Sequence, residues 1–243
     1  SIFRKSGEIQ FVVVSSTVPV AYDQVESVAN EFKVDTMKLN HKIIIKWLPK
    51  FTVAYDVNKL GSDRLIAAGG AFMFLTDNEL NAKDDHHVEA VIVVDAGTAV
   101  NVEVIRLDKG YIGGSISPGF RLMKSALSRG TAQLPCAKDE LEVPKPVGTC
   151  TLECIASGVY SAVCGGVYNI VSRICRNGPL KDICNVQVVF TGGDCDVLLG
   201  HLKLDIERNV PNVKSVTSQP LYVLKSMCNI ALLPISKMAS LLD

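Results

Sequence analysis

The residues with the clearest chemical potential are an acid, a glycine and a threonine that interrupt an apolar stretch. Residues 91–94 are four β-branched residues in a row, which predicts a buried strand. Asp-Ala-Gly-Thr follows at 95–98, and an alternating run at 100–105 predicts a second strand. Gly97 lets backbone N–H groups approach a ligand, and such donors with the Thr98 hydroxyl suit phosphate oxygens. Asp95 is suited to hold a cation or its bound water, although a plain hairpin turn is the alternative.

A second glycine turn stands at Thr191-Gly192-Gly193-Asp194. The apolar run before it, residues 185–190, predicts a strand, and a helix is predicted from about Cys195. A glycine pair between a strand and a helix suits a nucleotide, because the N–H groups and dipole of the helix face it. A plain loop is the alternative.

A third set of reactive side chains, Gly61-Ser62-Asp63-Arg64, precedes a helix predicted from Leu65 to about Leu75. A carboxylate such as Asp63 can accept the proton of an alcohol within hydrogen-bond reach. Arg64 offers a fork of donors that matches a carboxylate. The alternatives are that Asp63 caps the helix and that Arg64 forms an ordinary ion pair.

Two further sets of possible metal ligands are better explained as structural. Asp84-Asp85-His86-His87 lies within the polar segment 76–89, and adjacent residues seldom point the same way, so we favour a solvated loop over a metal site. None of the eight cysteines pairs at the two-residue spacing of a zinc knuckle, Cys150 and Cys154 coming nearest. We expect reduced thiols, mostly in the core.

Composition excludes several classes of protein. Apolar residues make up 48% and charged residues 21% of the chain, as in ordinary soluble globular proteins. The formal net charge is zero, with 25 basic and 25 acidic residues, so no excess of positive charge favours nucleic acid or a membrane surface. We find no apolar run near the roughly 18 residues that cross a bilayer. We therefore expect a cytoplasmic protein without a nucleic-acid or membrane partner.

The elements that must position these groups alternate between strands and helices. Strands are predicted at 9–14, at 110–116 and, as one or two strands around Ile43–Ile45, within residues 32–50. Helices are predicted at 21–31, with Asp23 near the start as a cap, at 120–129, at 151–174 and in the tail from Gln219. Glycine turns recur at strand ends, which favours an α/β protein with a ligand cleft outside those ends. The polar segment 76–89 suggests a boundary between lobes at 1–88 and 89–243.

The order of these motifs resembles the type III pantothenate kinases, a branch of the actin/Hsp70/sugar-kinase superfamily. The motifs are Gly61-Ser62-Asp63-Arg64, Asp95-Ala96-Gly97-Thr98-Ala99, Gly113-Gly114-Ser115-Ile116-Ser117-Pro118-Gly119 running to Pro135, and Thr191-Gly192-Gly193-Asp194. The likeness extends from about Val12 to about Leu199. It implies two RNase H-like lobes with ATP in the cleft between them, and a homodimer with pantothenate near its interface. The implied reaction transfers the γ-phosphoryl group of ATP to pantothenate, the first step towards coenzyme A.

The resemblance also implies roles for individual residues. Asp63 corresponds to the general base, and residues 61–64 correspond to a pantothenate-binding loop in which Arg64 contacts the substrate carboxylate. Tyr55 and Thr151 correspond to further pantothenate contacts, helix capping being the alternative for Thr151. Gly97 and Thr98 correspond to ATP-phosphate contacts, Gly192 and Gly193 to residues near the adenosine, and Asp95 to the ligand of a monovalent cation (K⁺ or NH₄⁺). Mg²⁺ would accompany ATP.

One family motif is missing from residues 1–243. Type III pantothenate kinases begin with an Asp-x-Gly-Asn-Thr turn on their first strand, whose place here would lie upstream of Ser1. We therefore expect the first lobe to be truncated at its amino end in this sequence. Two alternatives stay open: a non-catalytic nucleotide- or pantothenate-binding regulatory homologue, and, more weakly, another sugar or small-alcohol kinase of the superfamily.

Overall fold

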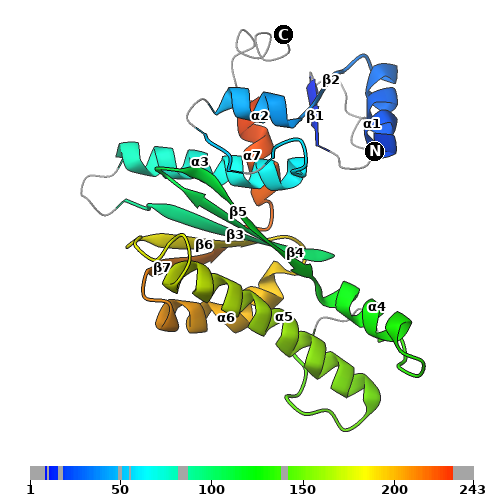
Figure 1. Ribbon diagram of the computed structural model, residues 1–243. Coiled ribbons are helices and arrows are strands. Elements are labelled where there is room, and N and C mark those ends of the chain that lie inside the picture. Colours follow the sequence, from blue (N-terminus) through cyan, green and yellow to red (C-terminus); the bar gives the residue numbers. More distant parts are fainter. Residues whose placement is uncertain are drawn as a thin grey trace.

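The centre of the molecule is a five-stranded mixed sheet with helices on both faces (Figure 1). The computed structural model describes residue 9 and residues 11–15, 19–48, 51–54, 56–81, 87–137 and 142–231. The strands stand in the order β5-β4-β3-β6-β7, with the bounds β3 Ala90–Ala96, β4 Ala99–Arg106, β5 Gly110–Pro118, β6 Val186–Thr191 and β7 Val213–Ser218. β3, β4 and β5 form an antiparallel meander, whereas β6 runs parallel to β3 and β7 parallel to β6. The mixed α/β class predicted from the sequence is confirmed.

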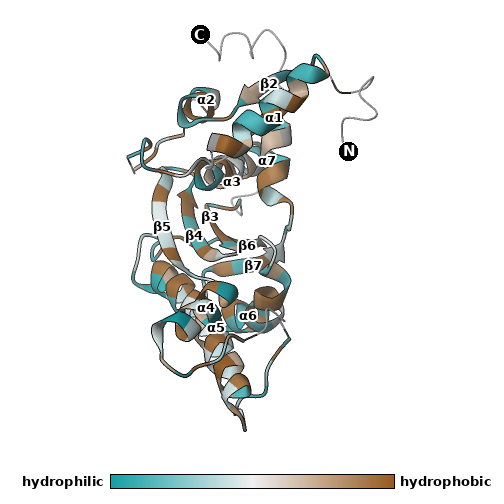
Figure 2. Ribbon diagram, turned by 90° about the vertical axis from the view of Figure 1, so that its right-hand side faces the viewer, coloured by the Kyte–Doolittle hydropathy of each residue, from teal (hydrophilic) through white to brown (hydrophobic). Residues whose placement is uncertain are grey.

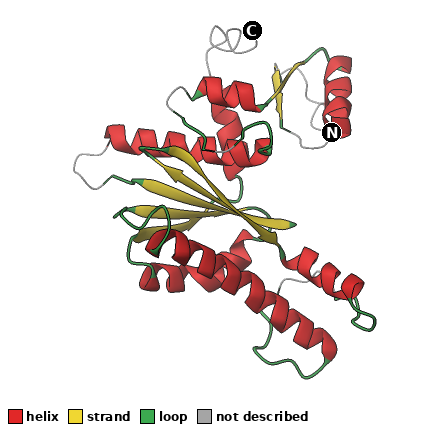
Figure 3. Ribbon diagram, in the orientation of Figure 1, coloured by secondary structure: helices red, strands yellow, loops and turns green. Residues whose placement is uncertain are grey.

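Four helices cover the two faces of this sheet (Figure 3). They are α5 Thr151–Arg176 and α6 Cys195–Asn209 on one face, and α3 Ser62–Asn81 and α7 Tyr222–Ala231 on the other. Side chains of β3 alternate between the two cores: Ile92 and Val94 join the core with α5 and α6, and Val91 and Val93 join the core with α3. A central strand covered on both faces is continuously apolar, which explains the run at 91–94.

The long helix α5 corrects one expectation from composition. By length and composition it could cross a membrane, whereas we expected no such segment. Nine of its residues, from Ile155 to Cys175, are buried, and its valines pack in the core beneath β3. A helix used in this way is the core helix of a globular domain.

The amino-terminal elements form a separate parallel pair of strands. β1 Phe11–Val14 pairs with β2 Asp35–Lys38, and the crossover between them contains α1 Pro19–Glu31. α2 His41–Trp47 then leads to α3, against which it packs. Figure 2 shows these elements and α3 at one end of the molecule, α4 Phe120–Gly130, α5 and α6 at the other, and the sheet between them.

Two predictions in this region are wrong. The strand predicted at Ile43–Ile45 is the helix α2, because the Asn40 side chain caps it by accepting the Ile43 N–H at 3.1 Å and because Ile44 is fully buried in the core shared with α3. Packing overrides the β preference of isoleucine here. Asp23 does not cap α1, because that helix begins at Pro19, a residue suited to the first helical position.

Other elements differ from prediction mainly in length. α3 extends in both directions, from Ser62 to Asn81, and β5 continues through Pro118. The strand β2 lies within residues 32–50, where one or two strands were predicted, whereas β7 was not predicted. The strands at 9–14 and 185–190 and the helices at 120–129 and 151–174 match β1, β6, α4 and α5 to within a few residues. Since α3 packs on the five-stranded sheet as well as on α2, the division at residue 88 stays a prediction.

The cysteines are less buried than expected. Of the seven described as free thiols, Cys164, Cys175 and Cys195 are buried, and Cys136, Cys150, Cys154 and Cys184 are exposed. The expectation of reduced thiols agrees with this, but the expectation of mostly core positions is wrong.

Candidate active site

The two glycine turns meet at one edge of the sheet. Asp95, at the carboxyl end of β3, is directly opposite Thr191, at the carboxyl end of the parallel strand β6. The Asp194 N–H then donates to the Ala96 carbonyl at 3.0 Å, which joins the second turn to the first. Both candidate nucleotide motifs therefore lie outside the same strand ends, where α/β sheets bind ligands.

Gly192 fits closely against the acid of the first turn. Its φ is +90°, a conformation that side chains other than glycine rarely adopt. A Cβ at this position would overlap the Ala96 carbonyl oxygen and would lie 2.5 Å from Asp95 Oδ1. In contrast, a Cβ at Gly193 would meet nothing within 4 Å. The glycine is required at 192 because backbone and a carboxylate approach it there.

The buried acid Asp194 completes this turn. It is 3% exposed, and Arg121 of α4 approaches it, with 3.6 Å between Arg121 Nη2 and Asp194 Oδ1. Neither residue was a predicted site residue, because an isolated arginine in a helix carries no signal of such a pair.

Asp63 lies in the same region, because α3 begins beside the end of β3. Asp63 is an exposed residue in the first turn of α3. Partial burial raises the pKa of Asp95, and the negative charges of Asp63 and Glu103 raise it further. The structure therefore brings the loop at 61–64 and the acid of the hairpin close enough for their charges to interact.

Arg64 forms a buried ion pair. Its Nε lies 2.5 Å from Glu103 Oε1 and its Nη2 lies 2.9 Å from Glu103 Oε2. Nη2 also donates to the Tyr111 hydroxyl at 3.0 Å. Glu103 was not a predicted site residue: it alternates with valines on β4, so the pattern suggested a solvated face, yet it is 1% exposed. Contact of Arg64 with a substrate stays a prediction, and one edge of its guanidinium is occupied.

Ser62, in the loop at 61–64, lies beside the end of β1. The Ser62 hydroxyl is 3.0 Å from that of Ser15, which follows β1. A Cβ at Gly61 would lie 2.5 Å from Asp63 Oδ1, so the glycine gives the carboxylate room. Tyr55 falls outside the described residues.

At the tip of the hairpin between β3 and β4, the Thr98 hydroxyl is more accessible to a ligand than the Gly97 N–H is. Thr98 is exposed, but the Gly97 N–H already donates to the Ala99 carbonyl at 3.0 Å. The expectation that glycine at 97 opens backbone donors to a ligand is therefore not met by the N–H of Gly97 itself. The Thr98 carbonyl accepts from Gly119, the residue before α4, at 2.9 Å.

Thr151 is not brought to Asp63 within one chain. It is exposed, at the start of α5, on the face of the sheet opposite α3 (Figures 1 and 2). It lines an apolar hollow of about 800 Å³ between α4 and α5. Thr151 is also not the helix cap: Cys150 occupies that position, and Glu153 accepts the Thr149 N–H and hydroxyl, both at 2.8 Å.

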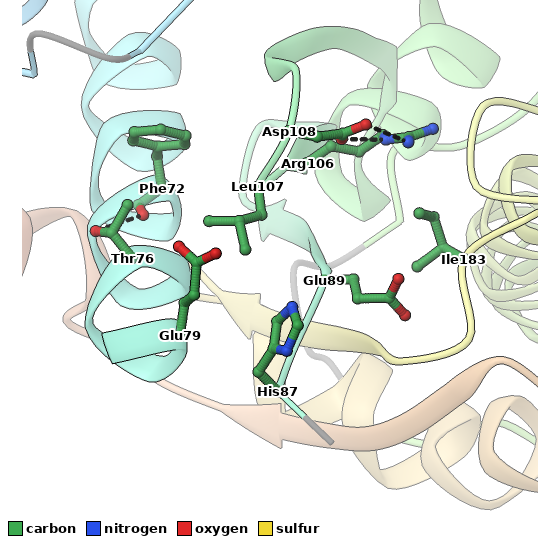
Figure 4. Close-up of a pocket in the computed structure, with 9 residues that line it drawn as sticks. All are labelled: Phe72, Thr76, Glu79, His87, Glu89, Arg106, Leu107, Asp108 and Ile183. Atoms are coloured by element: carbon green, nitrogen blue, oxygen red, sulfur yellow. Dashed lines mark hydrogen bonds and ion pairs between the residues drawn. The ribbon is translucent and has the colours of Figure 1, made fainter. Parts of the chain in front are cut away.

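A hollow of about 580 Å³ at the other end of β3 contains none of the residues predicted for the site, although His87 of the polar segment lines it (Figure 4). Arg106 pairs with Asp108 in two hydrogen bonds of 2.8 and 2.6 Å. Glu89 accepts the backbone N–H groups of Cys184 and Asn185, both at 2.9 Å. Since its main charged groups are already engaged in the fold, we do not assign the site here.

Metal ligands do not cluster elsewhere in the part of the chain that the structure describes. No group of three or more His, Cys, Asp or Glu side chains there could hold a metal ion. Of the Asp84–His87 segment only His87 is among the described residues. A cation at Asp95 stays a prediction.

Comparison with known proteins gives a consistent result. The family model for type III pantothenate kinase matches residues 1–173. Type III pantothenate kinases from Thermosipho africanus, Paracoccus denitrificans and Cereibacter sphaeroides are 33%, 37% and 34% identical over 200, 136 and 200 residues. These alignments cover 80%, 55% and 79% of this chain and 71%, 45% and 68% of the relatives. A solved Campylobacter jejuni protein described as of the Baf family of transcriptional activators aligns over 90% of this chain and 94% of its own at 20% identity, with a TM-score of 0.46; so low a similarity decides nothing about function.

Proposed function

This chain belongs to the type III pantothenate kinase family, and from that membership we propose that the protein phosphorylates pantothenate with ATP. The product would be 4′-phosphopantothenate, at the first step of coenzyme A biosynthesis. The observation that carries the proposal is the meeting of Asp63 and Asp95 beside two glycine turns at the carboxyl ends of β3 and β6. Phosphoryl transfer depends mainly on positioning and on neutralising charge, and this arrangement of groups suits both.

ATP would lie along the turns that end β3 and β6. The Thr98 hydroxyl and the backbone about Gly97 would contact its phosphates. Gly192 and Gly193, just before α6, would lie near the adenosine, beside the amino end of that helix.

A cation would relieve the repulsion at Asp95. Its carboxylate is partly buried beside the charges of Asp63 and Glu103, and a hard oxygen ligand with an unfavourable negative charge suits such an ion. We propose that Asp95 holds the monovalent cation, K⁺ or NH₄⁺, and that Mg²⁺ enters with ATP. Bound there, the ions would neutralise charge on the phosphates.

Asp63 would act as the general base. Its exposed carboxylate, fixed in the first turn of α3, can accept the proton of the primary hydroxyl of pantothenate as that oxygen attacks the γ-phosphorus. Residues 61–64 and Tyr55 would bind the rest of pantothenate. Arg64 would contribute guanidinium N–H groups other than those that bind Glu103 and Tyr111.

Thr151 fits the proposal only if a second copy supplies it. The exposed face of α5 carries the small residues Gly158, Ala162, Gly165 and Gly166, and small residues permit close approach of another backbone. We therefore include a homodimer, with pantothenate near its interface. The proposal also includes two RNase H-like lobes of the actin-like superfamily divided near residue 88, and a cytoplasmic enzyme without nucleic-acid or membrane partners.

The test is an assay of coupled ADP release with the complete reading frame, ATP, pantothenate and K⁺. Asp63→Asn is expected to lower kcat by about 10²–10⁴-fold, with pantothenate affinity by calorimetry changed little, because the side chain keeps its shape. Asp205→Asn, an exposed position on α6, is the matched control and should keep wild-type kcat. A wild-type rate for Asp63→Asn would remove the general-base assignment. Binding of both substrates without ADP release would favour the non-catalytic alternative.

A further inference from the structure

We propose that Glu103 and Tyr111 are positioning residues that hold Arg64, and through it Asp63, in place opposite Asp95. This inference rests on the proposed kinase function, and it goes beyond it by giving roles to two residues of the sheet that the proposed function leaves unassigned. We name the set Arg64, Glu103 and Tyr111 the arginine clamp.

The clamp is a closed ring of hydrogen bonds. Arg64 donates to both carboxylate oxygens of Glu103, at 2.5 and 2.9 Å, and to the Tyr111 hydroxyl at 3.0 Å. The Tyr111 hydroxyl donates in turn to Glu103 Oε2 at 2.6 Å. A two-pronged contact fixes the plane as well as the position of a guanidinium, so Arg64 has little freedom to turn.

The clamp is almost completely buried. Glu103 and Tyr111 are 1% and 0% exposed, and the Arg64 side chain is 12% exposed. Such a pair is not explained by stability alone, because a well-packed apolar replacement is often as stable as a buried ion pair. Removing one partner, however, leaves a buried charge without compensation. We infer that the clamp serves the groups beside it.

The sheet makes room for the clamp at a single position. Gly114 of β5 is directly opposite Glu103 of β4. A Cβ at Gly114 would overlap the Val102 carbonyl oxygen and would lie 2.6 Å from Glu103 Oε2. The Glu103 carboxylate can extend across β5 only because that position has no side chain.

The clamp also holds Asp63, the residue before Arg64, in place. Asp63 and Arg64 are consecutive residues of the first turn of α3, so fixing the guanidinium to the sheet fixes the start of the helix. Glu103 also lies close enough to Asp95 for its charge to act on that carboxylate. The clamp thus joins the helix that carries Asp63 to the strands that carry Asp95.

The test compares Glu103→Gln and Tyr111→Phe in the full-length enzyme, with Tyr168→Phe on α5 as the control for losing a tyrosine hydroxyl. We expect each clamp variant to lower kcat by about 10–100-fold, as a small misplacement of a catalytic group does, with a smaller rise in KM for pantothenate, because Arg64 also belongs to the proposed pantothenate loop. The double variant should lose less than the product of the single losses, because both changes break one ring. Tyr168→Phe should match wild type. A raised KM at unchanged kcat, or melting temperatures that fall without any change in kcat, would overturn the positioning role.

A second readout does not depend on kinase activity. Tyr111→Phe removes the hydrogen bonds that the Tyr111 hydroxyl makes with Arg64 and Glu103 and removes no charge. We expect the Leu65 N–H, which donates to the Gly61 carbonyl at 3.1 Å at the start of α3, to exchange its hydrogen faster than in wild type, because Arg64 then fixes this turn less firmly. An exchange rate equal to that of wild type would refute the clamp. A wild-type protein without pantothenate-dependent ADP release would refute the proposed function, and the exchange rate would still decide the clamp.

Discussion

The substitution Gly192→Ala tests the central geometry of the site. At this residue φ is +90°, and an added Cβ would overlap the Ala96 carbonyl oxygen and lie 2.5 Å from Asp95 Oδ1. The neighbouring chain cannot yield easily, because β3 is hydrogen-bonded to β4 on one side and to β6 on the other. We expect the variant to be destabilised and Asp95 to be displaced.

The magnitude follows from two costs. A residue other than glycine held at positive φ costs about 1–3 kcal/mol, and crowding in a packed site costs about 1–3 kcal/mol. Their sum, about 4 kcal/mol at its centre, lowers the melting temperature of a chain this long by about 8–16 °C. That loss is a large fraction of the roughly 5–15 kcal/mol that stabilises a typical domain.

The assay is thermal unfolding followed by circular dichroism, with Gly193→Ala as the matched control one residue away. A Cβ at Gly193 would meet no atom within 4 Å and its φ is not positive, so that variant should stay within about 1 kcal/mol of wild type. Equal melting temperatures for the two variants would refute the close approach of this turn to Asp95.

Two further predictions concern titration and reactivity. The pKa of Asp95 is raised by burial and by two like charges, so its contribution to stability is greatest at low pH and is lost as pH rises from the ordinary carboxyl value through the raised one. Asp95→Asn should therefore raise the melting temperature of the ligand-free protein at pH 7, and the difference from wild type should shrink below about pH 4. Addition of K⁺ should raise the melting temperature of wild type but not that of the variant. Burial raises the pKa of Cys164 to about 11 and that of Cys175 to about 12. Peptide mass spectrometry after brief iodoacetamide treatment at pH 8 should therefore find both thiols unmodified, and it should find the exposed cysteines modified, namely Cys136, Cys150, Cys154 and Cys184. Modification of Cys175 in the folded protein at the rate seen in urea would contradict this.

The sequence by itself determined the motifs and the local elements around them. The uninterrupted apolar run at 91–94 predicts a strand covered on both faces, and glycines at the ends of β3 and β6 mark turns. Such features are local, because residue size and backbone freedom act within a few residues. The order of the motifs was also sufficient to indicate the family to which the chain belongs.

Only the tertiary structure decided which side chains meet. Nothing in the pattern of β4 distinguishes a solvated acid from Glu103, which is buried and paired with an arginine 39 residues earlier. The isoleucines at 43–45 favour a strand by propensity but form a helix, because Asn40 caps it and α3 covers it. Thr151 corresponds to a pantothenate-contacting residue of the family, yet within one chain it lies across the sheet from Asp63. Contacts of this kind depend on how elements pack, and packing is set by the whole chain, whereas propensity and periodicity are set by neighbours in the sequence.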